Sequence, residues 1–256
     1  AENLAVQGDD NRKDDIFVRD VLEGKTNRAN IRTETLKQAN RDSSDPSISA
    51  EGEYVAFASS ADTLSKGDTN NSPDVFRYNR KLHATVRASL AFGGAGSNAA
   101  GPSSQPSISD DGKRIAFVSK AVNLVEDDAT NDPDVFVYDF EAKETTLVTN
   151  EVADGPAGDT DNPVISGNGR FVAFDSTASN LVEGDRNGVR DVFVYDLVEG
   201  EMVRVSVDEG GGEGSEASFD PSISSDGSFV TFTSEGRLVS TDTNGVPDVY
   251  LRGPLY

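Results

Sequence analysis

Pro46-Ser-Ile-Ser49 is the first of four copies of one short block, and this block decides the fold. The other copies are Pro106-Ser-Ile-Ser109, Pro163-Val-Ile-Ser166 and Pro221-Ser-Ile-Ser224. The four prolines are 60, 57 and 58 residues apart, so a unit of about 58 residues recurs along the chain. A period of this length is typical of propellers, solenoids and other arrays, in which each unit buries its faces against its neighbours.

Each unit repeats the same order of short apolar runs and turns. In the first complete copy the proline block is followed by the turn Glu51-Gly52, the apolar run Tyr54–Phe57, a long polar connection and the run Asp74–Tyr78. A glycine turn between two apolar runs predicts a hairpin, because glycine accepts a positive φ. A fourth, more polar run suits an edge strand. We predict this edge strand at Ile31–Thr33, Thr85–Arg87, Thr146–Val148 and Met202–Val205.

Four short antiparallel strands in each repeated unit predict an all-β fold, the β-propeller, with one unit per blade. Shorter periods without glycine hairpins would be expected of a β-solenoid. We predict one propeller domain over residues 1–256 with about five blade equivalents. Three blades are expected to be complete, at 46–90, 106–150 and 163–208, and two partial, at 1–34 and 221–256.

Two stretches of the repeat carry a family resemblance. Ser109–Ser119 with Asp134–Asp139, and Ser224–Ser234 with Asp248–Leu251, follow the pattern Ser-x-Asp-Gly, an apolar run ending in Phe-x-Ser, and then Asp-Val-Phe or Asp-Val-Tyr. This pattern resembles the WD40-like (PD40) repeat of TolB-like β-propellers. The resemblance implies a secreted, periplasmic or cell-surface protein that serves as a binding scaffold. It does not imply one activity, because function lies in sites and not in the fold.

The charge of the chain limits its partners. Acidic residues outnumber basic ones 45 to 23, and the net charge is −22. Nucleic acid and anionic membranes are therefore poor partners, since phosphate binding needs clustered basic residues. No apolar run approaches the ~20 residues that span a bilayer, so no membrane insertion is expected. The chain has no cysteine, which excludes disulfides and thiol chemistry.

A polar triplet recurs in the loop before the third strand of each unit. Carboxylate and amide oxygens at this spacing could supply part of a calcium shell, which needs about six to eight oxygens. The same side chains could instead cap turns by accepting bonds from backbone amides. The candidate ligands are Asp9, Asn11 and Asp15; Asp68, Asn70 and Asp74; Asp128, Asn131 and Asp134; Asp185, Asn187 and Asp191; and Asp242, Asn244 and Asp248.

Nothing in the sequence marks a catalytic centre. His83 is the single histidine, it has no counterpart in other units, and we interpret it as a solvated loop residue. We therefore expect a noncatalytic protein-binding or assembly scaffold, in which the incomplete terminal blades bind a protein partner or a second copy. The alternatives are a hydrolase or lyase with its site at the central channel, and a carbohydrate-binding propeller. Repeat-breaking residues at the mouth of the channel would favour an active site there, and at the ends and edge of the ring they would favour assembly.

Overall fold

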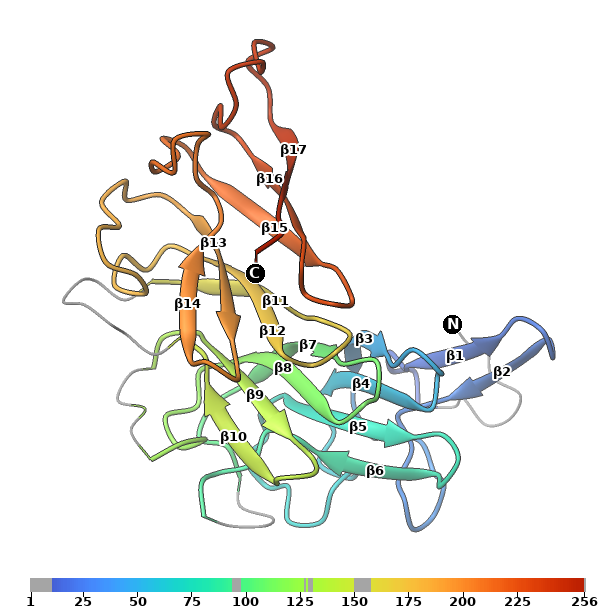
Figure 1. Ribbon diagram of the computed structural model, residues 1–256. Coiled ribbons are helices and arrows are strands. Elements are labelled where there is room, and N and C mark those ends of the chain that lie inside the picture. The colour runs from blue at the N-terminus through green and yellow to red at the C-terminus, as the bar shows by residue number, and fades with distance from the viewer. Residues whose placement is uncertain (1–10, 94–97, 127, 129–130, 150–157, 256) are drawn as a thin grey trace.

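The computed structural model describes all residues except 1–10, 94–97, 127, 129–130, 150–157 and 256. The described residues form five antiparallel sheets and no helix (Figure 1). The sheets are β1 (Phe17–Asp20) and β2 (Lys25–Arg28); β3 (Ser43–Ile48), β4 (Tyr54–Ser59), β5 (Asp74–Asn79) and β6 (Ala84–Arg87); β7 (Ser103–Ile108), β8 (Arg114–Ser119), β9 (Asp134–Asp139) and β10 (Glu144–Leu147); β11 (Thr160–Ile165), β12 (Phe171–Ser176), β13 (Asp191–Asp196) and β14 (Glu201–Arg204); and β15 (Ser218–Ile223), β16 (Val230–Ser234) and β17 (Asp248–Arg252).

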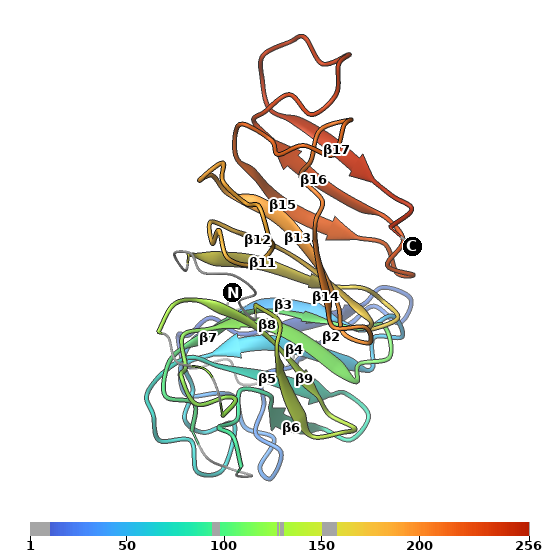
Figure 2. The ribbon, with the colours of Figure 1, turned by 60° about the vertical axis from the view of Figure 1, so that its left-hand side comes forward.

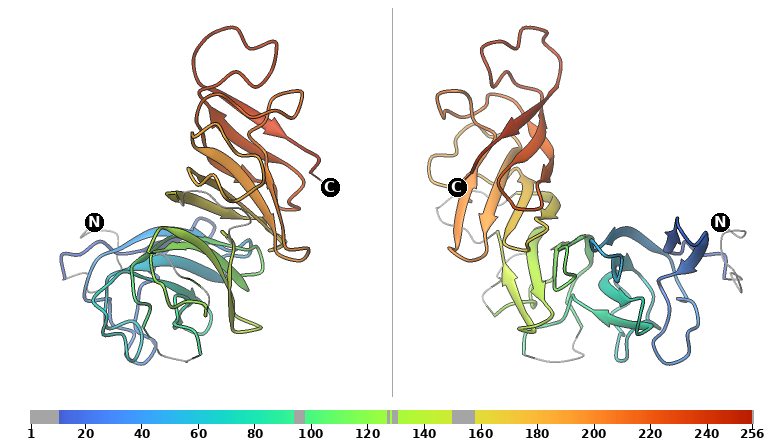
Figure 3. Two further views of the ribbon diagram at one scale, coloured as in Figure 1. Left: turned by 90° about the vertical axis from the view of Figure 1, so that its left-hand side faces the viewer. Right: turned by 45° about the vertical axis from the view of Figure 1, so that its right-hand side comes forward.

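The predicted all-β propeller fold is confirmed. Three sheets have four strands, the first described sheet has two, and the last has three. The strands β3, β7, β11 and β15 are the inner strands, and β3 contacts β7, β7 contacts β11, and β11 contacts β15. The sheets fan out around this axis as an open arc, with β1–β2 at one end and β15–β17 at the other (Figures 2 and 3).

The core lies between blades. Each of four apolar clusters joins two consecutive sheets, as expected for a repeat that hides its faces against its neighbours. Within each complete blade two phenylalanines on β-strand partners stack, as Phe57 and Phe76 do at 5.8 Å between ring centroids. The long loops are fixed to these clusters by buried leucines, which are Leu64, Leu124, Leu181 and Leu238.

The inner strands do not coincide with the four proline blocks of the sequence. Each begins before its proline, and its register with the second strand shifts across that proline, as between Ser44 and Ser47. The residue before each proline has a positive φ: Asp45 at 51°, Gln105 at 52°, Asn162 at 54° and Asp220 at 54°. Such a bulge redirects a side chain. All four bulges lie on the inner strands, beside the axis.

One predicted strand is wrong. The outer strand of the first unit is β2 at Lys25–Arg28, and not Ile31–Thr33. Gly24, with φ of 67°, turns the chain directly after β1, so pairing starts earlier. Ile31 forms only an isolated bridge with Gln38, and it packs against the apolar cluster between the β1–β2 sheet and the β3–β6 blade. Ile31 is therefore apolar because it packs between blades, and not because it belongs to a strand.

Across the described part of the chain, no helix has the length and apolar character needed to cross a membrane.

Candidate functional site

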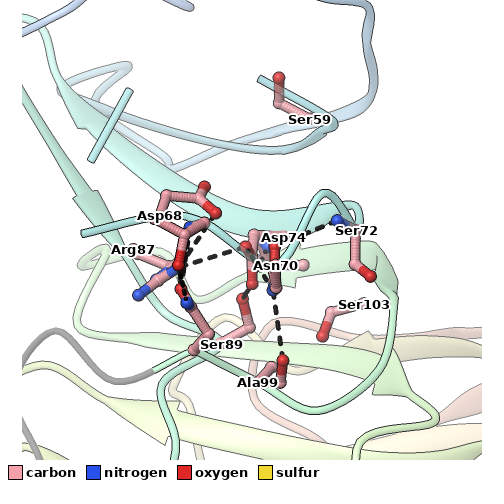
Figure 4. Close-up of polar contacts among 12 residues, drawn as sticks. Ser59, Asp68, Asn70, Ser72, Asp74, Arg87, Ser89, Ala99 and Ser103 are labelled. Carbon is pink, nitrogen blue, oxygen red and sulfur yellow. Dashed lines mark hydrogen bonds and ion pairs between the residues drawn. The ribbon is translucent and has the colours of Figure 1, made fainter. Parts of the chain in front are cut away.

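Both aspartates of the polar triplet in the β3–β6 blade pair with one arginine (Figure 4). Nη1 of Arg87 lies 3.3 Å from Oδ2 of Asp74 and 3.5 Å from Oδ1 of Asp68. Ser89 donates to the other oxygen of Asp74 at 2.5 Å. Asn70 donates to Asp74 and to the carbonyl of Ala99, in the segment leading to the next blade. The guanidinium of Arg87 thus lies beside both carboxylates, in the position that a metal ion bound by them would need.

Burial dominates the electrostatics of this cluster. The side chains of Asp68, Asp74 and Arg87 are 3%, 0% and 1% exposed. Burial, with the nearby charge of Asp74, raises the pKa of Asp68 to about 6. Burial also raises the pKa of Asp74, although bonds from Ser89 and the charge of Arg87 act in the opposite direction. Loss of solvent is thus the main cause of both upward pKa shifts, and repulsion from Asp74 adds to the shift of Asp68.

The β11–β14 blade repeats the arrangement. Arg204 lies 3.1 Å from Oδ1 of Asp185 and 3.6 Å from Oδ2 of Asp191. Ser206 donates to Asp191, and Asn187 donates to Asp191 at 2.7 Å. Burial raises the pKa of both aspartates.

The first unit contains the same elements in its described part. Arg28 Nε lies 3.3 Å from Oδ2 of Asp15, and Asn30 donates to Oδ1 of Asp15. Asn11 instead donates to the carbonyl of Ala39 and accepts a backbone bond from Lys13, which is turn chemistry. Asp9 lies outside the described residues.

The other two copies lack the arginine. In the β7–β10 blade Leu147 pairs with Phe136, the position where Arg87 pairs with Phe76. Asp134 accepts a 2.6 Å bond from Thr149, Asp128 is partly buried, and Asn131 is exposed. In the last sheet, Asn244 donates to Asp248 at 2.9 Å, and Asp242 accepts from Tyr250 at 2.6 Å.

Sequence reasoning therefore found the acidic half of each cluster but missed Arg28, Arg87 and Arg204. Their signal was present, because an arginine recurs at the end of three outer strands. In the described residues, no group of three or more acidic or histidine side chains is arranged to hold a metal ion. Calcium binding at these loops stays a prediction.

A second polar site lies where the inner strands meet. A cavity of about 420 Å³ is lined by the four bulge residues, the four prolines that follow them and three neighbours. Asp45 and Asp220 are exposed, whereas Gln105 and Asn162 are half-buried. Among the described residues that line it, none is basic: Asp45, Pro46, Ser47, Gln105, Pro106, Ser107, Asn162, Pro163, Val164, Asp220 and Pro221.

An ion pair that breaks the repeat supports one side of this cavity. Arg190 replaces the proline found at positions 73, 133 and 247, and Asp175 replaces Ala58, Val118 or Thr233. Arg190 bonds Asp175, which is fully buried, and lies 3.3 Å from Oδ2 of Asp161. Burial raises the pKa of Asp175.

The buried carboxylate then fixes two of the lining residues. Asp175 Oδ2 accepts bonds from the Asn162 amide at 2.9 Å and from the Asp220 backbone N–H at 3.1 Å. Asn162 also donates to Asp220 Oδ1 at 3.3 Å, and its backbone N–H donates to Gln105 at 2.8 Å. The network joins three inner strands and holds their polar side chains at the cavity.

A hydrogen bond joins two hairpin turns at one end of the inner strands. Ser225 donates to Asp110 Oδ2 at 2.6 Å, although an entire blade separates the two residues in sequence. Gly167 lies between them, and a Cβ on it would be 2.1 Å from both side chains. The three hairpin turns are therefore packed together at this end of the inner strands.

His83 is remote from this cavity in the chain's topology. It lies in the turn between β5 and β6, the two outer strands, and it is exposed. Its Nδ1 is 2.7 Å from the hydroxyl of Tyr78.

No family model and no curated relative matches the chain. It is similar to the crystal structure of TolB from Acinetobacter baumannii, with 15% identity and a TM-score of 0.52, over 94% of this chain and 46% of that one. It is also similar to the putative TolB from Agrobacterium tumefaciens, with 16% identity and a TM-score of 0.52, over 90% of this chain and 66% of that one. A third similar structure is an oligogalacturonate lyase in complex with manganese, with 16% identity and a TM-score of 0.52, over 92% of this chain and 53% of that one. The chain thus spans about half to two thirds of these proteins, and its fold is that of the TolB-like β-propellers.

Proposed function

We propose that this protein is a noncatalytic β-propeller scaffold that binds a protein partner through the axial cavity. The supporting observation is that the charged residues breaking the repeat, Asp175 and Arg190, gather beside this cavity and hold its lining in place. The loop clusters, in contrast, follow the repeat and bond mainly to their own blade. A site specific to this chain is therefore expected at the axis.

The group that the cavity binds is a cationic side chain, lysine or arginine, presented by the partner. Asp45 and Asp220 supply negative charge, and Gln105 and Asn162 supply amide oxygens. The rings of Pro46, Pro106, Pro163 and Pro221 line the same space and offer apolar surface to the aliphatic part of such a side chain. The net charge of −22 attracts a basic partner over a longer range.

Repeat-breaking residues beside the channel are the feature expected of an active site, but the bonds within this network favour binding over catalysis. Asp175 is held by Arg190, Asn162 and a backbone amide, so it is occupied as an acceptor and cannot easily move a proton. We propose further that the protein works in the periplasm, outside the cell or at the cell surface, as the TolB-like repeat implies.

Isothermal titration calorimetry with a short lysine peptide tests the proposal. The probe is acetyl-Gly-Lys-Gly-amide, and its Nε-acetylated form is the ligand control. Asp45→Asn with Asp220→Asn is expected to weaken binding about tenfold. Glu183→Gln with Glu201→Gln removes the same charge at exposed positions and is expected to leave affinity within about twofold.

Three results would contradict the proposal. The wild type would fail to bind the peptide, or the acetylated peptide would bind equally well, or both double variants would lose affinity equally. The last result would show general electrostatic attraction in place of a site.

A further inference from the structure

The dipeptide Asn-Gly occurs three times in the chain, at Asn168-Gly169, Asn187-Gly188 and Asn244-Gly245. This dipeptide is chemically labile, because the backbone nitrogen of the glycine can attack Cγ of the asparagine side chain. Glycine hinders that attack least, since it has no Cβ. Hydrogen bonds that hold the asparagine amide or the glycine N–H oppose the reaction, so the folded structure decides which of the three pairs reacts.

Asn187 and Asn244 occupy the same position in two units and form a matched pair. Each is followed by Gly-Val, and Gly188 and Gly245 have φ of 66° and 70°, with nothing within 4 Å of an added Cβ. Nδ2 of each asparagine donates to the aspartate four residues later, at 2.7 Å for Asn187 and 2.9 Å for Asn244. Oδ1 of each accepts the backbone N–H two residues later, at 3.1 Å and 3.0 Å. The local sequence and these local bonds therefore do not distinguish the two residues.

A contact with the following blade holds the amide of Asn187. Nδ2 of Asn187 also donates to the carbonyl of Gly214 at 3.0 Å, in the segment that leads to β15. The backbone N–H of Arg186 donates to Glu213 at 2.7 Å and ties the same loop to this segment. The amide of Asn70 is held in the same way in the β3–β6 blade. Nδ2 of Asn187 must break this additional bond before it can leave.

The amide of Asn244 lacks the additional bond. Asn244 belongs to the β15–β17 sheet, the last of the five, and among the described residues its Nδ2 donates only to Asp248. Asn244 and Gly245 are both exposed, whereas Asn187 is half-buried. Of the matched pair, Asn244 is thus the less restrained and the more accessible to water.

The third pair is restrained at both of its reacting groups. The N–H of Gly169, which carries the attacking nitrogen, donates to the carbonyl of Ser166 at 2.9 Å. Nδ2 of Asn168 donates to the carbonyl of Asp226 at 2.8 Å, and Oδ1 of Asn168 accepts the backbone N–H of Arg170 at 2.9 Å. The reaction at Asn168 therefore requires the hairpin turn to open first.

We propose that Asn244 is a site of spontaneous deamidation in the folded protein. The backbone nitrogen of Gly245 forms a bond to Cγ of Asn244, and the bond between Cγ and Nδ2 breaks. Nδ2 takes the proton of the glycine N–H and leaves as ammonia, and the product is a cyclic succinimide. A water molecule then opens the ring at either of its carbonyls, which yields aspartate or isoaspartate at position 244.

The modification changes the loop between β16 and β17. It removes the amide that donates to Asp248, and it adds a carboxylate close to Asp242 and Asp248, so like charges repel at the start of β17. Isoaspartate also reroutes the main chain through the side-chain carbon. No residue that lines the axial cavity takes part, so the modification is independent of the proposed function.

Peptide mapping by mass spectrometry, after incubation at neutral pH, measures the conversion of all three pairs in one sample. In the folded protein Asn244 is expected to convert about five- to tenfold faster than Asn187, the factor that corresponds to one additional hydrogen bond. The same incubation in guanidinium chloride removes the folded structure. There Asn187 and Asn244 are expected to convert within about twofold of each other, because they share the sequence Asn-Gly-Val.

Asn244→Gln is the matched variant, because it keeps an amide at the site and moves it one carbon further from the backbone nitrogen. It is expected to show no conversion at position 244 and unchanged conversion at Asn168 and Asn187. The proposal is overturned if Asn168 or Asn187 converts as fast as Asn244 in the folded protein. It is also overturned if Asn244 stays unmodified in the folded protein while the denatured chain converts, or if Asn244 leads by the same factor in the denatured chain.

Discussion

Nη1 of Arg87 lies 3.3 Å from Oδ2 of Asp74, and both side chains are almost completely removed from solvent. The arginine ends the outer strand of its blade, and the aspartate begins the neighbouring strand. Together with Asp68 they place three charges in the interior of one loop, where each depends on the others for compensation.

Replacing Arg87 with methionine should therefore destabilise the protein by about 3–5 kcal/mol, because two buried carboxylates lose their counter-charge. Urea unfolding measures the change. The control is Lys66→Met, whose side chain is 86% exposed in a pair with Glu34, and its free energy of unfolding should stay within experimental error of the wild type. Equal, small effects in both variants would show that the arginine does not neutralise the cluster.

The β7–β10 blade offers a test of the calcium prediction, because Leu147 stands where other blades have arginine. If Asp128, Asn131 and Asp134 bind calcium, adding calcium after chelation should raise the melting temperature of the wild type. Leu147→Arg should abolish that rise by supplying a guanidinium in place of the ion. The prediction is contradicted if neither calcium nor chelator changes the melting temperature of the wild type.

Asp68 makes stability depend on pH in a specific direction. Its pKa is raised to about 6 in the folded protein, so between about pH 4 and pH 6 the folded state holds a proton that the unfolded chain has released. This contribution therefore favours the folded state at low pH and is lost as pH rises through 6. Asp68→Asn removes the titration, so its stability relative to the wild type should increase from about pH 4 to about pH 7.

Urea unfolding of both proteins at several pH values gives this difference directly. Both proteins contain the carboxyl groups whose pKa values are lowered, such as Asp139 and Asp196. The contribution of these groups to the pH dependence of stability therefore cancels in the difference. A difference that stays constant over the interval, or shrinks as pH rises, is incompatible with the raised pKa of Asp68.

Two glycines separate backbone strain from contact between blades. Gly112 and Gly245 have φ of 71° and 70°, but a Cβ on Gly112 would overlap Tyr54, whereas nothing lies within 4 Å at Gly245. Gly245→Ala should cost about 1–2 kcal/mol through the backbone alone. Gly112→Ala should cost about 1–3 kcal/mol more, because the tyrosine must move. Thermal unfolding compares them, and equal costs would mean that the blades are not in close contact at this turn.

The fold was predictable from the sequence because the unit is copied. The glycine turns, the apolar second strands and the strand that begins at Asp74 each recur with nearly constant spacing. The outer strand of the first unit could not be predicted in the same way, because Ile31 is apolar where it packs between blades and lies outside the strand.

The candidate sites were only half predictable. Asp68 and Asp74 stand out in the sequence as a repeated acidic pattern, but their partner Arg87 comes from another strand and is brought near by pairing. Asp175 and Arg190 are 15 residues apart and meet only because β12 pairs with β13. Comparing equivalent positions of the four units would have marked both as exceptions.

The central claim is that the axial cavity is the binding site of a basic partner. Nuclear magnetic resonance of the isotope-labelled chain, titrated with acetyl-Gly-Lys-Gly-amide, tests it most directly. The account predicts shift changes concentrated at Asp45, Gln105, Asn162 and Asp220, the residues that line the cavity. Changes spread over the acidic loops, with those four residues unaffected, would contradict it.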